Sequence, residues 1–181
     1  MLHPDYRFCP RCATELQVSD TDGRDRRRCP ACGFVHWNNP APVVAGLVQV
    51  GDMMLMARNA AWPPKTFALI TGFLEAGETP EQGIVREVKE ETNLDVDRTE
   101  LIGVYEFMRK NELIIAYHVM AYGEVTLSPE LVEYRMVEPA RMKPWRAGTG
   151  MAVADWMTRN GLPYEFAEFP GRRPVRNDGD E

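Results

Sequence analysis

The chain has 181 residues, 44% hydrophobic and 27% charged, which suits a soluble protein with one main core and room for a small module. Its formal net charge of −6 argues against a general affinity for nucleic acid or anionic membrane, so neither is an expected partner. Because no apolar run is long enough to span a membrane and the N-terminus lacks the apolar core of a signal peptide, we expect a cytoplasmic protein.

All four cysteines fall near the N-terminus, in two pairs separated by sixteen residues. Each pair has the spacing Cys-x2-Cys, which lets both thiolates and the backbone N–H groups of the turn converge on one metal ion. Four thiolates favour a structural, tetrahedral Zn²⁺, with iron in a rubredoxin-like site and disulfides as the alternatives. The predicted zinc ligands are Cys9, Cys12, Cys29 and Cys32.

The chain divides by pattern into three parts. We expect residues 1–38 to form a zinc ribbon of short strands, with a polar hairpin tip at 20–25. Residues 39–165 should form the main domain, and residues 166–181, rich in proline, glycine and charge, a disordered tail. Strands and one C-terminal helix are expected in the main domain, with strands at 42–50, 53–58, 67–71, 99–108, 113–125 and 130–137, and the helix at 145–159.

The segment from Gly72 to Leu94, GFLEAGETPEQGIVREVKEETNL, is the most informative part of the chain. A helix is expected from about 80 to 92, because Thr79 can serve as its N-cap and Gln82 can complete a capping box. Asn93 falls where the helix should end in a left-handed residue, a conformation that asparagine tolerates.

Three glutamates of this helix, at positions i, i+3 and i+4, share one face. Glu87, Glu90 and Glu91 would repel one another there unless a cation lay between them. Mg²⁺ and Mn²⁺ prefer such oxygen ligands and commonly bridge to substrate phosphates. The pattern therefore predicts a divalent-metal site, with a solvated acidic helix face as the alternative.

The same segment resembles the Nudix hydrolase signature, G-x5-E-x7-R-E-U-x-E-E-x-G-U, in which U is a bulky aliphatic residue. Every specified position matches except that Asn93 replaces the second glycine. The resemblance implies an α+β fold, a Nudix α/β/α sandwich with a mixed sheet, preceded here by the small zinc ribbon. It also implies a metal-dependent hydrolase of a pyrophosphate bond.

A zinc ribbon followed by a Nudix box resembles the NADH pyrophosphatase branch of the family and its relatives that act on ADP-ribose or FAD. The implied reaction cleaves a nucleoside diphosphate linked to another group and releases a nucleoside monophosphate. NADH-preferring members carry SQPWPFPxS shortly after the box, whereas this chain has YEFMRKNE at 105–112. We therefore expect ADP-ribose, FAD or a related small nucleotide as the preferred substrate, and residues 105–112 as a region that discriminates between substrates.

The resemblance implies which residues bind the metal. Glu87, Glu90 and Glu91 would bind Mg²⁺ or Mn²⁺, with Glu130 and the Gly72 carbonyl as further ligands.

Further residues are candidates for catalysis and substrate binding. Arg86 would orient carboxylates through an ion pair with Glu78 or Glu87, and Glu87, Glu91 or a loop carboxylate would be the general base. Arg58 is a candidate for a substrate phosphate, with an ordinary surface arginine as the alternative. Four aromatic residues are candidates for stacking on adenine, with core packing as the alternative for each: Phe67, Tyr105, Phe107 and Tyr117.

Other functions stay open at this point. A catalytically silent Nudix-fold module could sense a nucleotide or bind nucleic acid through its ribbon, although a sensor has no need of all three glutamates. A nucleoside-triphosphate pyrophosphatase is the other alternative, and a homodimer is compatible with the sequence. The arginine-rich run at 24–28 is interpreted as a solvated hairpin tip, with binding of nucleic acid or phosphate as its alternative.

Overall fold

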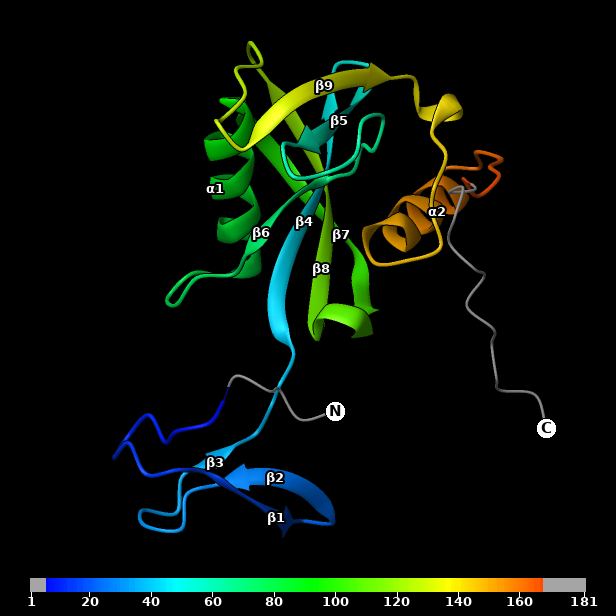
Figure 1. The fold of residues 1–181 in the computed structure, drawn as a ribbon. Coiled ribbons are helices and arrows are strands. Elements are labelled where there is room, and N and C mark those ends of the chain that lie inside the picture. Colours follow the sequence, from blue (N-terminus) through cyan, green and yellow to red (C-terminus); the bar gives the residue numbers. More distant parts are fainter. Residues whose placement is uncertain (1–5, 168–181) are drawn as a thin grey trace, which may run out of the picture. The chain divides into compact units, whose positions relative to one another are not determined.

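The computed structural model of the chain describes residues 6–167, so nearly all of the predicted disordered tail lies outside the described residues. The chain separates into two compact units, residues 1–40 and residues 41–181 (Figure 1). In the described part of the chain, no helix has the length and apolar character needed to cross a membrane.

The first unit is a three-stranded antiparallel sheet in the order β1-β2-β3. A hairpin joins β1 (Gln17–Thr21) to β2 (Arg24–Arg28), and the short β3 (Val35–His36) pairs with the end of β2. The hairpin tip is tighter than predicted, because only Asp22 and Gly23 lie outside the strands, both with positive φ. The core of this unit is small: Leu16 is buried with Cys9 and Cys29, and Phe34 packs against them.

The second unit is built on a six-stranded sheet with the strand order β7-β8-β4-β5-β9, and β6 pairs separately with β4. Strands β4 and β8 run parallel, whereas the other pairs are antiparallel, so the predicted mixed sheet is confirmed. The strands are β4 (Ala41–Val50), β5 (Met53–Asn59), β6 (Ile70–Phe73), β7 (Asp95–Phe107), β8 (Glu112–Tyr122) and β9 (Leu131–Val137).

Two helices cover opposite faces of this sheet, α1 (Pro80–Thr92) and α2 (Thr149–Arg159) (Figure 1). Ile84 and Val88 of α1 belong to one hydrophobic core, and Val153 and Met157 of α2 belong to a second core. Two separate cores on the two faces of one sheet confirm the predicted α/β/α sandwich. Short 3₁₀ turns, Met108–Lys110 and Pro139–Arg141, follow β7 and β9.

The predicted boundaries of α1 are confirmed by its caps. The Thr79 side chain accepts a hydrogen bond from the Gln82 backbone N–H at 3.3 Å, and the Gln82 side chain accepts one from the Thr79 N–H at 2.8 Å. Asn93 has a φ of 61° and donates its backbone N–H to the Lys89 carbonyl. Asparagine therefore does in this chain what glycine commonly does at the end of a helix.

Four predicted boundaries were wrong by a few residues, one of them the end of the strand predicted at 113–125, which stops at Tyr122. The strand predicted at 67–71 begins only at Ile70, because Ala68 makes no more than an isolated bridge to Ala57. Strand β7 begins at Asp95, soon after α1, since it continues its pairing with β8 as far as Tyr122. Helix α2 starts at Thr149 instead of 145, because Gly148 takes a positive φ that interrupts a helical path.

Candidate active site and zinc centre

Gly72 on β6 lies directly against Glu87 of α1. A Cβ atom at position 72 would lie 1.9 Å from the carboxyl carbon of Glu87, so any side chain there would displace the Glu87 carboxylate from its present position. Glycine is therefore favoured here by close approach and not by its backbone angles. Because residue 72 has no side chain, the Glu87 carboxylate of α1 can pack directly against the backbone of β6.

Arg86 joins the loop before α1 to the acidic face of the helix. Its Nε and Nη2 donate to the two carboxylate oxygens of Glu78 at 3.1 and 2.7 Å, a bidentate ion pair. Its Nη1 donates to Glu87 at 2.6 Å and to Glu90 at 3.1 Å. The guanidinium thus fixes three carboxylates at once, and its Nη2 also reaches the carbonyl of Phe73 at 3.1 Å.

Low solvent exposure and close pairing shift the pKa values of Arg86 and Glu78. The side chains of Glu78 and Glu87 are only 15% and 12% exposed, so an unpaired charge on either would be costly. The Arg86 guanidinium, together with the Glu75 N–H at 2.7 Å, lowers the pKa of Glu78 below its usual range. The same carboxylates raise the pKa of Arg86, which is therefore a permanent cation within the acidic cluster.

Glu91 differs from its neighbours on the helix. Burial raises the pKa of Glu91 to about 7, and the negative charges of Glu87, Glu130 and Glu90 add to the effect. Negative charge is therefore in excess around Glu91, as expected of a face that binds a cation.

Glu130 is exposed and belongs to the loop before β9, and two contacts bring this loop to α1. The Ser128 N–H donates to the Glu91 carbonyl at 3.0 Å, and the Thr126 N–H donates to the Thr92 carbonyl at 2.9 Å. On its other side, the Glu130 carbonyl accepts a hydrogen bond from Ala60. The loop that carries Glu130 thus lies against the end of α1 that carries Glu91, although the two segments are far apart in the sequence.

In the first unit, the four cysteines place one Sγ atom each within 4.8 Å of the others. Within residues 6–167 this is the only group of three or more metal-ligand side chains that meets this distance. Cys9 and Cys32 have their sulfur atoms 3.5 Å apart, as do Cys12 and Cys29. Four sulfur atoms at such distances suit tetrahedral Zn²⁺, so the cysteines fit the predicted zinc centre.

Both cysteine pairs are held by the same type of turn. The Ala13 N–H donates to the Cys9 carbonyl, and the Gly33 N–H donates to the Cys29 carbonyl. Backbone N–H groups also point at the sulfur atoms, that of Arg11 at Cys9 and that of Cys32 at Cys29. Hydrogen bonding with Thr14 lowers the pKa of Cys12 to about 6, and the Cys32 N–H lowers the pKa of Cys29. These bonds favour thiolates, the form that binds zinc, at Cys12 and Cys29, whereas burial and the neighbouring cysteines raise the pKa of Cys32 to about 12.

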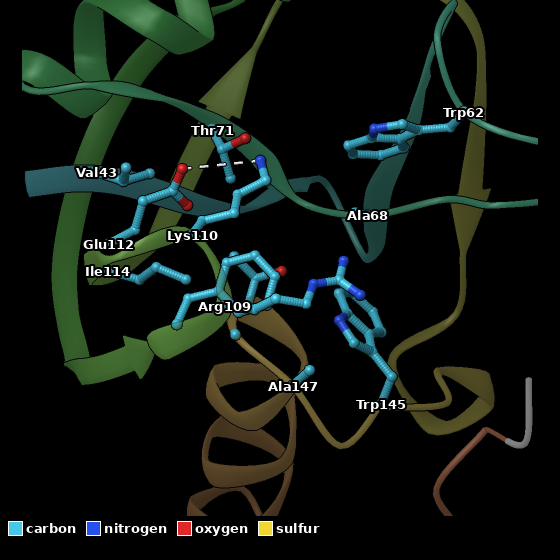
Figure 2. Close-up of a pocket in the computed structure, with 13 residues that line it drawn as sticks. Val43, Trp62, Ala68, Thr71, Arg109, Lys110, Glu112, Ile114, Trp145 and Ala147 are labelled. Carbon is cyan, nitrogen blue, oxygen red and sulfur yellow. Dashed lines mark ion pairs between the residues drawn. The ribbon is translucent and has the colours of Figure 1, made fainter. Parts of the chain in front are cut away.

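A cavity of about 220 Å³ opens beside β6 (Figure 2). Trp62 from the loop after β5 and Trp145 from the segment before α2 contribute indole rings to its lining. Arg109 and Lys110, from the 3₁₀ turn after β7, contribute cationic groups. Lys110 pairs with Glu112 at 3.7 Å, and Figure 2 shows Arg109 reaching toward Trp145. Aromatic rings beside cations suit a flat ligand that carries negative charge.

Strand β6 connects this cavity to the carboxylates. Thr71 lines the cavity and pairs with Ala45, which belongs to the core under α2. Gly72 pairs with Val44, which belongs to the core under α1. Successive residues of a strand face opposite sides of the sheet, so the cavity and the carboxylates lie on opposite sides but at adjacent residues of one strand.

Of the five residues considered for substrate contacts, Phe107 lines this cavity, whereas Arg58, Phe67, Tyr105 and Tyr117 do not. Arg58 pairs across the strands with Glu133, its Nε 3.3 Å from a carboxylate oxygen. Phe67 packs against the core under α2 and has the Arg135 guanidinium 4.1 Å from its ring centroid. The Tyr105 hydroxyl donates to Asp155 of α2 at 2.7 Å, and burial together with this partner raises the pKa of Tyr105. Each side chain therefore already has a structural contact.

Sequence reasoning did not select the four side chains that give the cavity its character: Trp62, Trp145, Arg109 and Lys110. Arg109 and Lys110 lie within 105–112, the region expected to discriminate between substrates, and Phe107 and Glu112 from that region also line the cavity. The two tryptophans lie in connecting segments more than eighty residues apart in the sequence. Only the fold shows that these segments meet.

The fold and the site define a class of protein, an α/β/α sandwich with an arginine-centred carboxylate cluster at a loop–helix junction. The NUDIX domain matches residues 39–155, and the chain belongs to the NUDIX family. The crystal structure of a NUDIX hydrolase from Nitrosomonas europaea resembles the chain in fold, with a TM-score of 0.71 at 24% identity over 89% of this chain and 96% of that one.

Two curated relatives carry the name "NAD-capped RNA hydrolase NudC". The protein from Pseudomonas aeruginosa is 34% identical over 128 residues, which is 70% of this chain and 45% of the relative. The protein from Pseudomonas putida is 28% identical over 172 residues, which is 92% of this chain and 61% of the relative. The chain therefore spans about half the length of the curated relatives it matches.

Proposed function

We propose that the protein hydrolyses the pyrophosphate bond of a nucleoside diphosphate that is linked to a second group, as in ADP-ribose, FAD or NADH. The products would be a nucleoside monophosphate and the phosphorylated second group. The observation that carries the proposal is the arginine-centred carboxylate cluster where β6 meets α1. A cavity with aromatic and cationic lining opens on the other side of the sheet, at the adjacent residue of β6.

The donor chemistry of the cluster fits a hard divalent cation. Glu87, Glu90, Glu91 and Glu130 are all carboxylates, and the negative charge of the other three adds to the effect of burial in raising the pKa of Glu91. With the carbonyl of Gly72 they would hold Mg²⁺ or Mn²⁺. When bound, the metal supplies charge neutralisation at the phosphates and a lowered pKa for bound water.

Arg86 acts on the carboxylates and not on the substrate in this proposal. Its bonds to Glu78, Glu87 and Glu90 hold these side chains in place before substrate arrives, which lowers the cost of assembling the site. Glu78 fixes the loop through its bidentate pair with Arg86. The proton of the attacking water would pass to a carboxylate, with Glu91 and Glu87 as the candidate bases.

The cavity would hold one end of the substrate. Trp62 and Trp145 offer faces for stacking on a nucleobase or another flat ring. Arg109 and Lys110 offer charge to phosphates that extend toward β6. A dinucleotide-like molecule has both features, a flat ring at its end and a pyrophosphate within.

The proposed class of substrates includes NAD-type dinucleotides because of the names that the curated relatives carry. Those proteins are named for NAD-capped RNA, in which the pyrophosphate lies within a dinucleotide. The absence of SQPWPFPxS at 105–112, together with the cationic side chains found there, favours ADP-ribose or FAD instead.

The test is a panel of ADP-ribose, NADH, NAD⁺, FAD, Ap₄A, dNTPs and an RNA that begins with NAD, each with Mg²⁺ or Mn²⁺. Products are separated by chromatography. The proposal expects a nucleoside monophosphate from at least one pyrophosphate-linked dinucleotide or nucleotide sugar, and no product with Glu91→Gln. Turnover of dNTPs alone would contradict it, as would equal product with Glu91→Gln.

A further inference from the structure

The register of the hairpin in the first unit separates its charges between the two faces of the sheet. Directly paired residues of an antiparallel ladder point to the same face, and consecutive residues alternate. One face, here called the arginine face, carries three directly paired couples: Gln17 with Arg28, Ser19 with Arg26, and Thr21 with Arg24. Asp20 and Asp25, the acidic residues of these two strands, pair with each other on the opposite face.

The arginine face is therefore a row of cations without an acidic residue among its six members. Its three arginines are two residues apart along β2, which spaces them by about 6.7 Å. The net charge of the whole chain conceals this local excess. Residues 1–40 contain six arginines against five acidic residues, whereas residues 41–181 contain 15 basic against 22 acidic residues. Long-range repulsion of anions thus comes from the second unit.

Polar atoms on the same face lack partners. The hydroxyl oxygens of Ser19 and Thr21 and the Nε of Arg26 are shielded from solvent and have no hydrogen-bond partner, and on the opposite face the same holds for the Nε of Arg27. Buried polar atoms in folded proteins are nearly always paired, so several unpaired atoms on one small face point to a ligand that would satisfy them. Hydroxyl and guanidinium groups are common donors to phosphate oxygens.

An aromatic ring lies next to this row. The Arg26 guanidinium lies 4.8 Å from the centroid of the Trp37 ring, and its Nη1 donates to the Trp37 carbonyl at 2.6 Å. Trp37 is 48% exposed, although a large indole is usually covered in a folded protein. Cations that follow a phosphate backbone, beside an aromatic ring on which a base can stack, are the features that bind single-stranded nucleic acid.

We propose that the arginine face and Trp37 bind single-stranded nucleic acid. Phosphates would lie along Arg24, Arg26 and Arg28, and one base would stack on Trp37. A duplex is a poorer ligand, because its bases are already stacked and cannot reach the indole. The proposal revises the expectation that the run at 24–28 is only a solvated hairpin tip, and it is independent of the hydrolytic site.

The test measures the fluorescence anisotropy of a short, unstructured, labelled RNA on titration with the zinc-loaded full chain over a series of KCl concentrations. Three phosphate contacts predict a slope of log K against log salt of about −2, and Arg24→Ser/Arg28→Ser should reduce the steepness by about 1.4. The double variant Arg7→Ser/Arg11→Ser is the matched control, since it removes the same charge from the same unit but away from this face. It should bind as the wild type does.

Trp37→Ala should weaken binding about tenfold, whereas Trp37→Phe, which keeps a ring, should weaken it less. Zinc content shows that each variant retains the folded unit. Glu91→Gln should bind RNA like the wild type, which separates this surface from the hydrolytic site. The proposal is overturned by absent or salt-independent RNA binding, by equal losses in the two double variants, by equal affinity for duplex, or by binding to phosphatidylserine vesicles in place of RNA.

Discussion

The cysteine cluster and the glutamate face of α1 both gather anionic side chains, but the chain stabilises them by different means. The four cysteines lie within 4.8 Å of one another and receive backbone N–H groups, so the metal ligands are already close together. Glu87 and Glu90 are held by a cation of the protein itself, Arg86. Glu91 is held in a buried, negatively charged environment that raises its pKa. The comparison is consistent with the proposal of a tightly held zinc at the cysteines and an exchangeable Mg²⁺ or Mn²⁺ at the glutamates.

The largest expected effect is at the thiolates. Zinc contributes about 10–16 kcal/mol of apparent folding free energy in small zinc-binding peptides, and the first unit has little other core. Cys29→Ser should therefore lose zinc and unfold residues 1–40, and the second unit should keep its own sheet. Elemental analysis and limited proteolysis measure these two outcomes, with Arg11→Ser as the control that leaves the ligands intact. A folded first unit without any metal would contradict the prediction.

Chelation should distinguish the two sites in one sample. EDTA should abolish hydrolysis, because carboxylate sites bind Mg²⁺ and Mn²⁺ weakly, while zinc stays with the four thiolates. Adding Mg²⁺ or Mn²⁺ should restore activity without any change in zinc content. Activity assays and elemental analysis of the same dialysed protein decide the matter. Full activity in EDTA would refute an exchangeable catalytic metal.

At the carboxylates, Glu90→Gln and Glu91→Gln should each lower kcat/KM by at least about 10–100-fold. A loss of that size is typical even for residues that only hydrogen-bond to a metal ligand. Both variants should fold, because Gln retains the size of the side chain. Glu100→Gln, an exposed position on β7, is the matched control and should keep wild-type rates. Rates near wild type for both variants at saturating Mg²⁺ would show that these glutamates do not bind the catalytic metal.

Local patterns in the sequence predicted much of this arrangement. The caps of α1 depend on Thr79, Gln82 and Asn93, which act within a few residues of the helix, so its ends were predictable. The grouping of the four cysteines followed from their spacing for the same reason. The cavity was not predictable, because Trp62, Arg109 and Trp145 are brought together only by the order of strands in the sheet. The start of α2 was missed because apolar spacing continues through Trp145, whereas the backbone turns at Gly148.

The smallest expected effect concerns the stability of the metal-free protein. Glu91 has a folded-state pKa of about 7, above the ordinary value of 4.5, so its ionisation destabilises the fold as pH rises through this range. In EDTA, Glu91→Gln should raise the free energy of unfolding at pH 8 by about 1–2 kcal/mol, after allowance for solvent screening, and by less at pH 5.

Glu81 on the same helix provides a control of opposite sign. Its own backbone N–H, and then the Tyr117 hydroxyl at 3.0 Å, lower the pKa of Glu81, so its ionised form stabilises the fold above the ordinary pKa. Glu81→Gln should therefore lower the free energy of unfolding at pH 8, and the loss should shrink as the pH falls. Urea titrations of the two variants in EDTA at both pH values measure the contrast. If Glu91→Gln also destabilised the protein at pH 8, the acidic face would not carry the unfavourable charge that a metal is proposed to relieve.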